Sequence, residues 1–296
     1  MNDYVLTCCS TADLSRERFA DRNIQVVYFH FMIGNEDYLD DCGESVPPAE
    51  LFKRMGEGEI TKTSQVTIGE YISFFEDFLR KGKDVLHISL SGGISGSYNS
   101  AVMAKRELED VYPQRKIYIV DSLGASSGYG LIMETLADMR DAGMDIDTLH
   151  SWIEENKLCM HHWFFSTDLT YYIRGGRISK TAGFIGNMLN ICPLLNMDCK
   201  GVLTPREKLR GKRKAMNRAI EMMRLHAAGH EKYSGRCYMC HSNCYEDAKK
   251  LAGFIEEEFP ELKGKVQIWN IGATIGSVNC KSKCNLFDQH TFHCNC

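Results

Sequence analysis

The sequence predicts a two-lobed α/β protein whose N-terminal lobe contains a mostly parallel sheet. Short apolar runs rich in β-branched residues occur at 84–91, 115–121 and 236–241, and each ends in small or polar residues. Helical patterns separate these runs, so that strand and helix alternate along the chain. This order favours parallel strands with helices on both faces of the sheet. A chain of 296 residues is long enough for two packed lobes.

Five stretches carry helical patterns, at 68–80, 98–110, 127–142, 147–156 and 245–259. A second lobe is expected to follow, because MHHWFFST at 160–167 has the composition of a new strand. Lys200-Gly201, between β-prone residues, predicts a hairpin over 196–205, and a basic helix is expected to start at Arg206 and to extend to Arg218. We therefore expect lobes at 1–157 and 158–277, followed by an atypical cysteine-rich tail at 278–296.

Charge and composition argue against several classes of protein. The 35 basic and 39 acidic residues give a net charge of −4, which does not favour binding to nucleic acid or to an anionic membrane. The N-terminus lacks the pattern of a secretory signal, so a cytoplasmic protein is expected. The longest uncharged run, 181–197, is too short to span a bilayer and contains polar residues and a proline, which argues against stable membrane insertion. The scattered cysteines indicate reduced thiols.

The strongest local signal is the loop SGGISGS at 91–97, which links a predicted buried strand to the start of a helix. Unpaired backbone N–H groups and the positive end of the helix dipole make such a junction suitable for a carboxylate or phosphate. A plain strand-to-helix turn with a serine cap explains the same pattern equally well. The loop lacks the Gly-Lys-Ser/Thr ending of a Walker A motif, so nucleotide binding is not expected.

Two further segments are expected beside this loop. The hydroxyls of Thr63 and Ser64 precede a predicted helix, where they could cap the helix or reach an anion. Asp121-Ser122 and the small residues at 126–128 follow the next predicted strand. Open α/β sheets bind ligands along the edge where such strand ends meet.

Together these segments resemble the DegV family. The motifs that carry the resemblance occur in the family's order and cover roughly residues 3–277; they are CSTADL at 9–14, KTSQ at 62–65, LSGGISGSY at 90–98, VDS at 120–122, RGGRIS at 174–179 and IGATIG at 271–276. The resemblance implies a two-domain protein that holds a long-chain fatty acid between its lobes, similar to the FakB subunits of bacterial fatty acid kinases. It also implies a separate kinase subunit as partner, no cofactor, no metal and no catalytic residues of its own.

The resemblance assigns the carboxylate of the fatty acid to Thr63 and Ser64, and to the loop residues Ser91, Gly92, Gly93 and Ser95. Many family members have a second serine where this chain has Gly92, so backbone N–H groups, water or a neighbouring serine must replace that contact. Arg177 of the RGGRIS motif corresponds to an arginine associated with the head group and the kinase partner. An arginine that only ties down a loop is the alternative explanation.

The most continuous apolar segment of the chain follows that motif. Its residues could wall an acyl tunnel, although ordinary core packing explains the same pattern; the candidates are Phe184, Ile185, Met188 and Leu189. After Ser277 the sequence departs from the family, which has a His-Thr-Gly-Pro-Gly segment and a final apolar strand there. The histidine of that segment lies near the head group, so its loss would affect phosphoryl transfer more than lipid binding.

Two other functions remain open from the sequence. A metal-dependent hydrolase or phosphotransferase could use Asp13, Asp121 or Asp168 if two of these carboxylates converge at the sheet edge. A cysteine-rich metal-binding module would depend on the tail, which holds four cysteines and two histidines. Two other candidate clusters, Cys237/Cys240 and His161-His162, lie on predicted strands that direct the paired side chains to opposite faces, which argues against metal sites there.

Overall fold

The computed structural model of the protein describes residues 4–179, 190–278 and 284–289. The first sheet has four parallel strands in the order β2-β1-β6-β7. The bounds of these strands are Tyr4–Cys9 for β1, Ile24–Val27 for β2, Asp84–Ser89 for β6 and Ile117–Asp121 for β7. The predicted parallel sheet is therefore confirmed, and β6 and β7 lie within the two apolar runs that predicted them.

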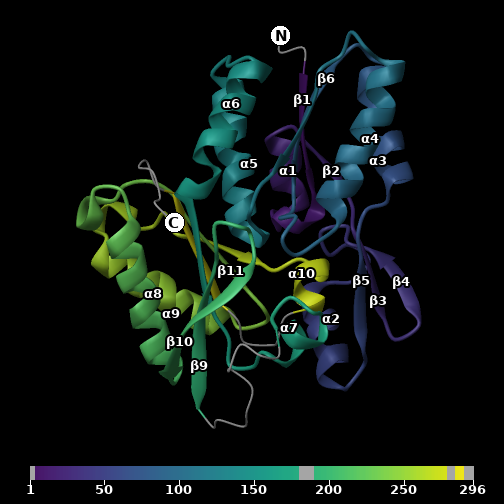
Figure 1. Cartoon of the computed structure of the whole chain (residues 1–296). Coiled ribbons are helices and arrows are strands. Elements are labelled where there is room, and N and C mark those ends of the chain that lie inside the picture. Colours follow the sequence, from purple (N-terminus) through teal and green to yellow (C-terminus); the bar gives the residue numbers. More distant parts are fainter. Residues whose placement is uncertain (1–3, 180–189, 279–283, 290–296) are drawn as a thin grey trace.

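Helices cover both faces of this sheet (Figure 1). α3 and α4 lie on one side, and α5 and α6 lie on the other. The helix bounds are Arg16–Asp21 for α1, Ile68–Leu79 for α3, Ser97–Val111 for α4, Ser126–Asp141 for α5 and Ile146–Asn156 for α6. Each of the last four begins within one residue of its expected start, because apolar residues at helical spacing mark these segments. Side-chain caps are present at the starts of α3 and α6.

A small antiparallel sheet in the order β4-β3-β5 adjoins the first sheet and was not predicted. Its strands are His30–Ile33, Glu36–Leu39 and Thr61–Ser64, and helix α2, Pro48–Gly56, lies between the last two in the chain. Each strand has only four residues, and TKTS of β5 contains no apolar residue. A strand of this kind is fixed by pairing with β3 rather than by a hydrophobic pattern of its own.

The second sheet has six strands in the order β10-β9-β8-β13-β11-β12, and all but one pair of neighbours are antiparallel. The strands are Met160–Phe165 (β8), Ile191–Met197 (β9), Leu203–Arg210 (β10), Cys237–His241 (β11), Gln267–Asn270 (β12) and Cys284–Gln289 (β13). Helices α8, Lys212–His226, and α9, Tyr245–Glu258, pack against it. The chain passes from the first sheet to the second between α6 and β8, through the 3-10 turn Lys157–Cys159.

The second lobe confirms the predicted hairpin and corrects the predicted basic helix. β9 and β10 pair through a turn in which Gly201 has a φ of +68°. Arg206 lies within β10, and α8 begins only at Lys212. The exposed residues Arg206, Lys208 and Arg210 alternate with the less exposed Glu207 and Leu209, as in a strand, and this segment pairs with β9.

The expected atypical tail contributes a strand to the interior of this sheet. β13 pairs with β8 on one side and with β11 on the other. The remaining residues of the tail, 279–283 and 290–296, lie outside the described part of the chain. Shorter 3-10 turns occur at Ser10–Ala12, His230–Lys232 and Pro260–Leu262, and the short helices α7, Thr170–Arg174, and α10, Ala273–Ser277, lie near the junction of the lobes.

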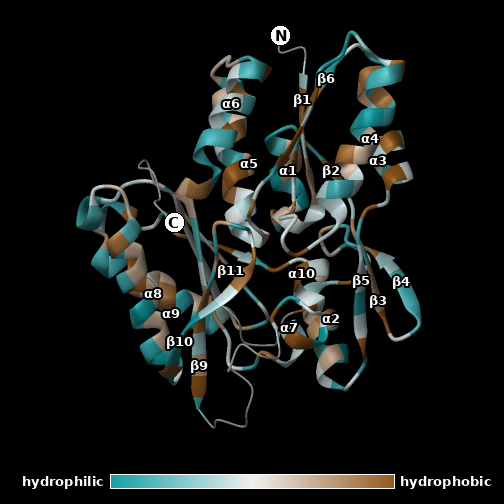
Figure 2. Cartoon of the chain, viewed as in Figure 1, coloured by the Kyte–Doolittle hydropathy of each residue, from teal (hydrophilic) through white to brown (hydrophobic). Residues whose placement is uncertain are grey.

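The two lobes meet where β11 packs against α5. Tyr238 and Cys240 of β11 belong to the hydrophobic core of the first lobe, whereas Cys237 belongs to that of the second. Figure 2 shows hydrophobic colour along β1 and β6 and hydrophilic colour over much of α6 and α8. Strand β11 therefore contributes side chains to the hydrophobic cores of both lobes.

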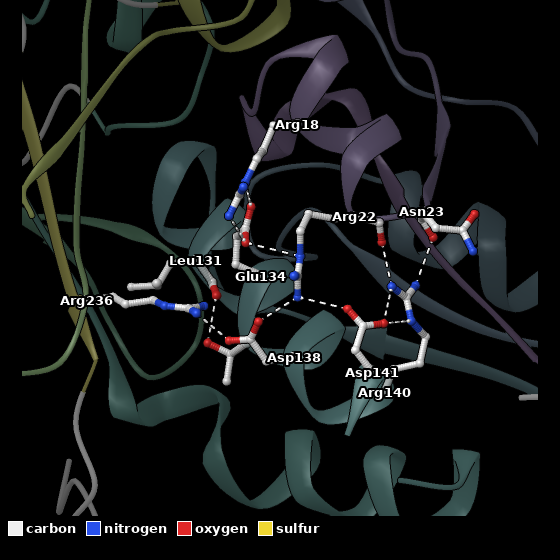
Figure 3. Close-up of polar contacts among 10 residues, drawn as sticks. Arg18, Arg22, Asn23, Leu131, Glu134, Asp138, Arg140, Asp141 and Arg236 are labelled. Carbon is white, nitrogen blue, oxygen red and sulfur yellow. Dashed lines mark hydrogen bonds and ion pairs between the residues drawn. The ribbon is translucent and has the colours of Figure 1, made fainter. Parts of the chain in front are cut away.

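An ion-pair network borders this junction (Figure 3). Glu134 of α5 is fully buried and pairs with Arg18 and Arg22 of the segment around α1. Asp138, one turn further along α5, pairs with Arg22 and with Arg236, which precedes β11. Carboxylates of α5 therefore link the N-terminal segment to the second lobe.

Candidate functional site

A cavity of about 360 Å³ lies between the lobes. Its polar lining residues are Thr63, Ser64, Gln65, Ser95, Ser126, Arg177 and Thr274. Its larger apolar lining residues are Phe29, Leu90, Ile94, Phe164, Tyr172, Met197, Leu203, Ile275 and Val278. The volume is typical of small-molecule sites, and a lining that combines polar and apolar residues suits a molecule with one polar end.

Thr63 and Ser64 lie on β5 and line the cavity, as the resemblance implied for the head group. Neither residue caps α3. The cap is Thr67, which accepts the N–H of Glu70, while the Glu70 carboxylate accepts the N–H of Thr67. The capping explanation for Thr63 and Ser64 is therefore wrong, and both residues belong to the lining of the cavity.

The loop before α4 divides into two parts with different contacts. Ser95 and Gly96 line the cavity. Ser91, Gly92 and Gly93 instead hold the loop to its neighbours: the Ser91 hydroxyl donates to the carbonyl of Gly201 at 2.8 Å, and the Gly92 N–H donates to the Asp121 carboxylate at 3.1 Å. A Cβ at Gly93 would lie 2.6 Å from the Gly201 carbonyl oxygen, so only glycine fits there. These three predicted ligand residues therefore anchor the loop and do not line the cavity.

Arg177 is half-buried in the cavity wall. Its Nε donates to the carbonyl of Ile94 at 3.2 Å, and one terminal nitrogen donates to the carbonyl of Gly175 at 2.6 Å. Burial lowers the pKa of the guanidinium, and no acidic side chain in the described part of the chain opposes that effect. A buried cation without a carboxylate partner is costly, so an anion that enters the cavity would be stabilised by it.

Two further polar residues line the cavity, Ser126 and Thr274; the sequence placed Ser126 at the ligand-binding edge of the sheet without assigning it a contact, and it assigned no role to Thr274. Ser126 is the first residue of α5, has a φ of +58°, and donates its hydroxyl proton to buried Asp13. Thr274 lies in α10, whose first N–H groups are accepted by buried Asp40. The motif IGATIG at 271–276 contains Thr274 and carried part of the family resemblance. It could therefore have drawn attention to this residue. Burial raises the pKa of Asp40, and the N–H groups that it accepts oppose this shift.

The end of the described C-terminal segment also reaches the cavity. Val278 lines it, immediately after Ser277. The resemblance placed a histidine-containing segment at this point, and the wall here presents methyl groups. The four acyl-tunnel candidates, Phe184, Ile185, Met188 and Leu189, lie outside the described residues.

The carboxylates proposed for an enzyme have separate partners. Asp13 accepts from Ser126, Asp121 accepts the N–H groups of Gly92 and Leu123, and Asp168 accepts the N–H of Thr170. Burial raises the pKa of Asp121, and these N–H groups counteract the shift. Within residues 4–179 and 190–278, no three His, Cys, Asp or Glu side chains are grouped closely enough to hold a metal ion. His161 stacks on His226, whereas the neighbouring His162 faces Gly124.

Comparison with known proteins identifies the family. The family model described as an uncharacterised protein of the DegV family matches residues 7–281. This chain belongs to the DegV family. A DegV domain-containing protein of Clostridium perfringens, CPE0026, is 33% identical over 94% of both chains. The DegV domain-containing protein YteA of Lactococcus lactis is 33% identical over 72% of this chain and 73% of its own.

Solved DegV structures share the fold throughout. A fatty-acid-binding DegV family protein from Thermus thermophilus superposes with a TM-score of 0.87 at 24% identity, covering 98% of this chain and 100% of the other. The fatty acid kinase B3 protein of Streptococcus pneumoniae, loaded with linoleic acid, gives 0.82 at 22% identity and covers 98% and 99%. DegV of Bacillus subtilis, a fatty acid binding protein, gives 0.81 at 27% identity and covers 97% and 99%. DegV-fold neighbours therefore include several fatty-acid-binding proteins.

Proposed function

We propose that this DegV protein binds a long-chain fatty acid with its carboxylate against Thr63, Ser95 and Arg177. The observation that carries the proposal is the cavity itself, which is lined by several hydroxyls, by apolar side chains and by an arginine that has no acidic partner among the described residues. The hydroxyls and the guanidinium donate hydrogen bonds to a carboxylate, and the apolar wall accepts an acyl chain. The linoleic acid in the kinase B3 protein and the fatty acid binding described for two other DegV-fold neighbours support this assignment.

Affinity and orientation would come from different parts of the ligand. Each methylene that leaves water contributes about 0.8 kcal/mol, so the chain supplies most of the binding free energy. The carboxylate contributes less, because its contacts replace strong hydration. It would nevertheless fix which end of the molecule lies at β5 and α4.

We further propose that the protein acts as a carrier that presents the carboxylate to a separate kinase subunit, in the cytoplasm. No role in phosphoryl transfer is assigned to its own side chains. The similarity to the kinase B3 protein of Streptococcus pneumoniae supports the carrier role. Within the described part of the chain, every helix is too short or too polar to cross a bilayer.

The first test is to ask what the purified protein carries. Organic extraction followed by mass spectrometry should release a long-chain fatty acid in about one-to-one ratio with the protein. The proposal would be contradicted if delipidated protein bound no palmitate.

The phosphorylation step is tested separately, by adding the kinase subunit and ATP to the loaded protein: acyl-phosphate should form only when both proteins are present. Metal-dependent turnover by this chain alone would favour the hydrolase alternative.

A further inference from the structure

A second cavity adjoins the one that we propose for the fatty acid. It has a volume of about 440 Å³ and is lined by residues of both lobes. Polar and charged side chains form part of its lining, and its apolar lining residues are Leu123, Leu158, Met160, Trp163 and Met197. The first cavity, at about 360 Å³, is near the lower end of the range of about 300–1,000 Å³ that is usual for ligand sites. A long ligand would therefore gain room if the two cavities were continuous.

The two cavities share one residue. Among the described residues, Met197 alone lines both of them. It is the last residue of β9, is 9% exposed, and pairs across the hairpin with Leu203 of β10, which lines the first cavity. The side chain of Met197 therefore forms part of the wall between the cavities.

The backbone beside this wall is closely packed. Leu123 lines the second cavity and Ala125 lines the first, so the chain passes from one cavity to the other at Gly124. A Cβ at Gly124 would lie 2.5 Å from the imidazole ring of His162, which is fully packed against this backbone. Methionine, in contrast, is unbranched and flexible. Shortening of the Met197 side chain is thus the smallest change that would join the cavities.

We propose that Met197 closes the fatty-acid cavity against the second cavity and thereby limits the length of the acyl chain that the protein accepts. This inference rests on the proposed function and adds a residue that determines its specificity. Thr63 of β5 and Met197 of β9 line the cavity from different lobes, so an acyl chain whose carboxylate lies at Thr63 extends toward the second lobe. Methylenes beyond the wall would stay unburied, and they would add little to the binding free energy.

The test compares two acids that differ only in length. Palmitate and arachidate, which is four methylenes longer, are each titrated against delipidated protein by displacement of a fluorescent fatty acid analogue. The wild-type protein should bind arachidate no more tightly than palmitate. Met197→Ala should gain about tenfold or more in arachidate affinity and change at most about threefold in palmitate affinity. Met197→Leu, which keeps the volume of the side chain, should stay near wild type.

A double variant tests where the additional methylenes go. Leu158 lines the second cavity and not the first, so Leu158→Trp fills the second cavity without touching the first. This substitution alone should leave both affinities unchanged. Combined with Met197→Ala, it should abolish the gain in arachidate affinity.

The possible outcomes have separate meanings. The inference is overturned if the wild-type protein binds arachidate tenfold more tightly than palmitate, if Met197→Ala brings no gain, or if the gain persists in the double variant. Failure of the wild-type protein to bind palmitate would instead overturn the proposed function. If Met197→Ala does not fold, as judged by thermal unfolding without ligand, Met197→Val is measured in the same way and should show a smaller gain for arachidate.

Discussion

Arg177 is the single side chain on which the electrostatics of the site depend most. It is half-buried, its two hydrogen-bond acceptors are neutral carbonyls, and burial alone shifts its pKa. Its presence therefore costs stability in the empty protein and favours binding of an anion. The sequence motif pointed to this residue, but only the placement of the neighbouring elements shows that no described acidic side chain pairs with it.

Arg177→Gln should accordingly weaken fatty acid binding without a matching loss of stability. We expect palmitate affinity to fall about tenfold or more, and the free energy of unfolding to change by less than about 1 kcal/mol. Titration of ligand and chemical denaturation measure the two effects. Arg174→Gln is the matched control, because Arg174 is exposed and stacks on Tyr171 instead of lining the cavity. Equal weakening by both variants would contradict a specific role for Arg177.

His87 gives a second prediction at the scale of a residue, and it concerns stability. The ring is fully buried between Thr7, whose hydroxyl lies 2.9 Å from Nδ1, and Cys9, whose sulfur lies 3.7 Å from Nε2. Burial lowers the pKa of His87 from 6.5 to about 3. Between these two pH values the unfolded chain binds a proton that the folded protein excludes, so folding stability is lost as the pH falls.

The slope of unfolding free energy against pH tests this statement. In the window from about pH 6 to pH 4, His87→Gln should lessen the loss of stability by up to about 1.4 kcal/mol per pH unit. His162 is buried in the same way, with its pKa lowered to about 3, so the wild-type slope contains both contributions. The exposed His230→Gln serves as control. An unchanged slope in His87→Gln would show that the ring is protonated in the folded state.

At the scale of elements, two threonines four residues apart make different contacts, one on β5 and the other at the start of α3. Thr63 lies on a strand that pairs with β3 and faces the cavity, whereas Thr67 forms the capping box of α3. The sequence predicted α3 correctly, because its apolar spacing is clear. It did not separate the two threonines, because TKTS has no pattern that identifies a strand. The pairing of β5 with β3 in the small sheet places Thr63 on a strand, outside α3.

Thr63→Ala and Thr67→Ala should therefore have complementary effects. Loss of the Thr67 cap should reduce the free energy of unfolding by about 1 kcal/mol and leave fatty acid affinity unchanged. Loss of the Thr63 hydroxyl should weaken palmitate retention several-fold and leave stability nearly unchanged. Denaturation and ligand titration of both variants measure this double contrast. If Thr67→Ala were the variant that lost the ligand, our assignment of the two residues would be wrong.

Other elements show where local sequence patterns are insufficient. The parallel sheet and its main helices could be predicted, because the hydrophobic periodicity of each segment indicates them locally. β10 was expected to begin a helix, since a run of alternating charges has no apolar face to distinguish helix from strand. α10 and β13 reach their places through contacts with distant segments, α10 with β5 and β13 with β8 and β11. Long-range contacts of this kind leave little trace in a local pattern.

At the scale of the whole molecule, the lobes are joined on one side by β11 and α5 and enclose the cavity nearby. Cys240 of β11 lies 2.9 Å from the Ser126 hydroxyl, so the junction extends to a residue that lines the cavity. The ion pairs of Glu134 and Asp138 border the same junction (Figure 3).

The two carboxylates of the junction should differ in their contribution to stability. Glu134 has no exposed side-chain surface, and Glu134→Gln leaves Arg18 and Arg22 without their buried partner, which should cost about 3 kcal/mol. The Asp138 side chain is 44% exposed, so Asp138→Asn should cost less than about 1 kcal/mol. Denaturant unfolding of both variants, fitted with a common slope, measures the difference. An equal loss of unfolding free energy in the two variants would contradict the view that burial makes the Glu134 ion pairs the more important ones.

The most direct test of the whole account is a crystal structure of the protein loaded with palmitate. We predict density for an extended acyl chain in the cavity between the lobes, with its carboxylate within hydrogen-bond distance of the Thr63 hydroxyl and facing Arg177. A cavity that contains only water, or an acyl chain whose carboxylate points away from Thr63, would contradict the account.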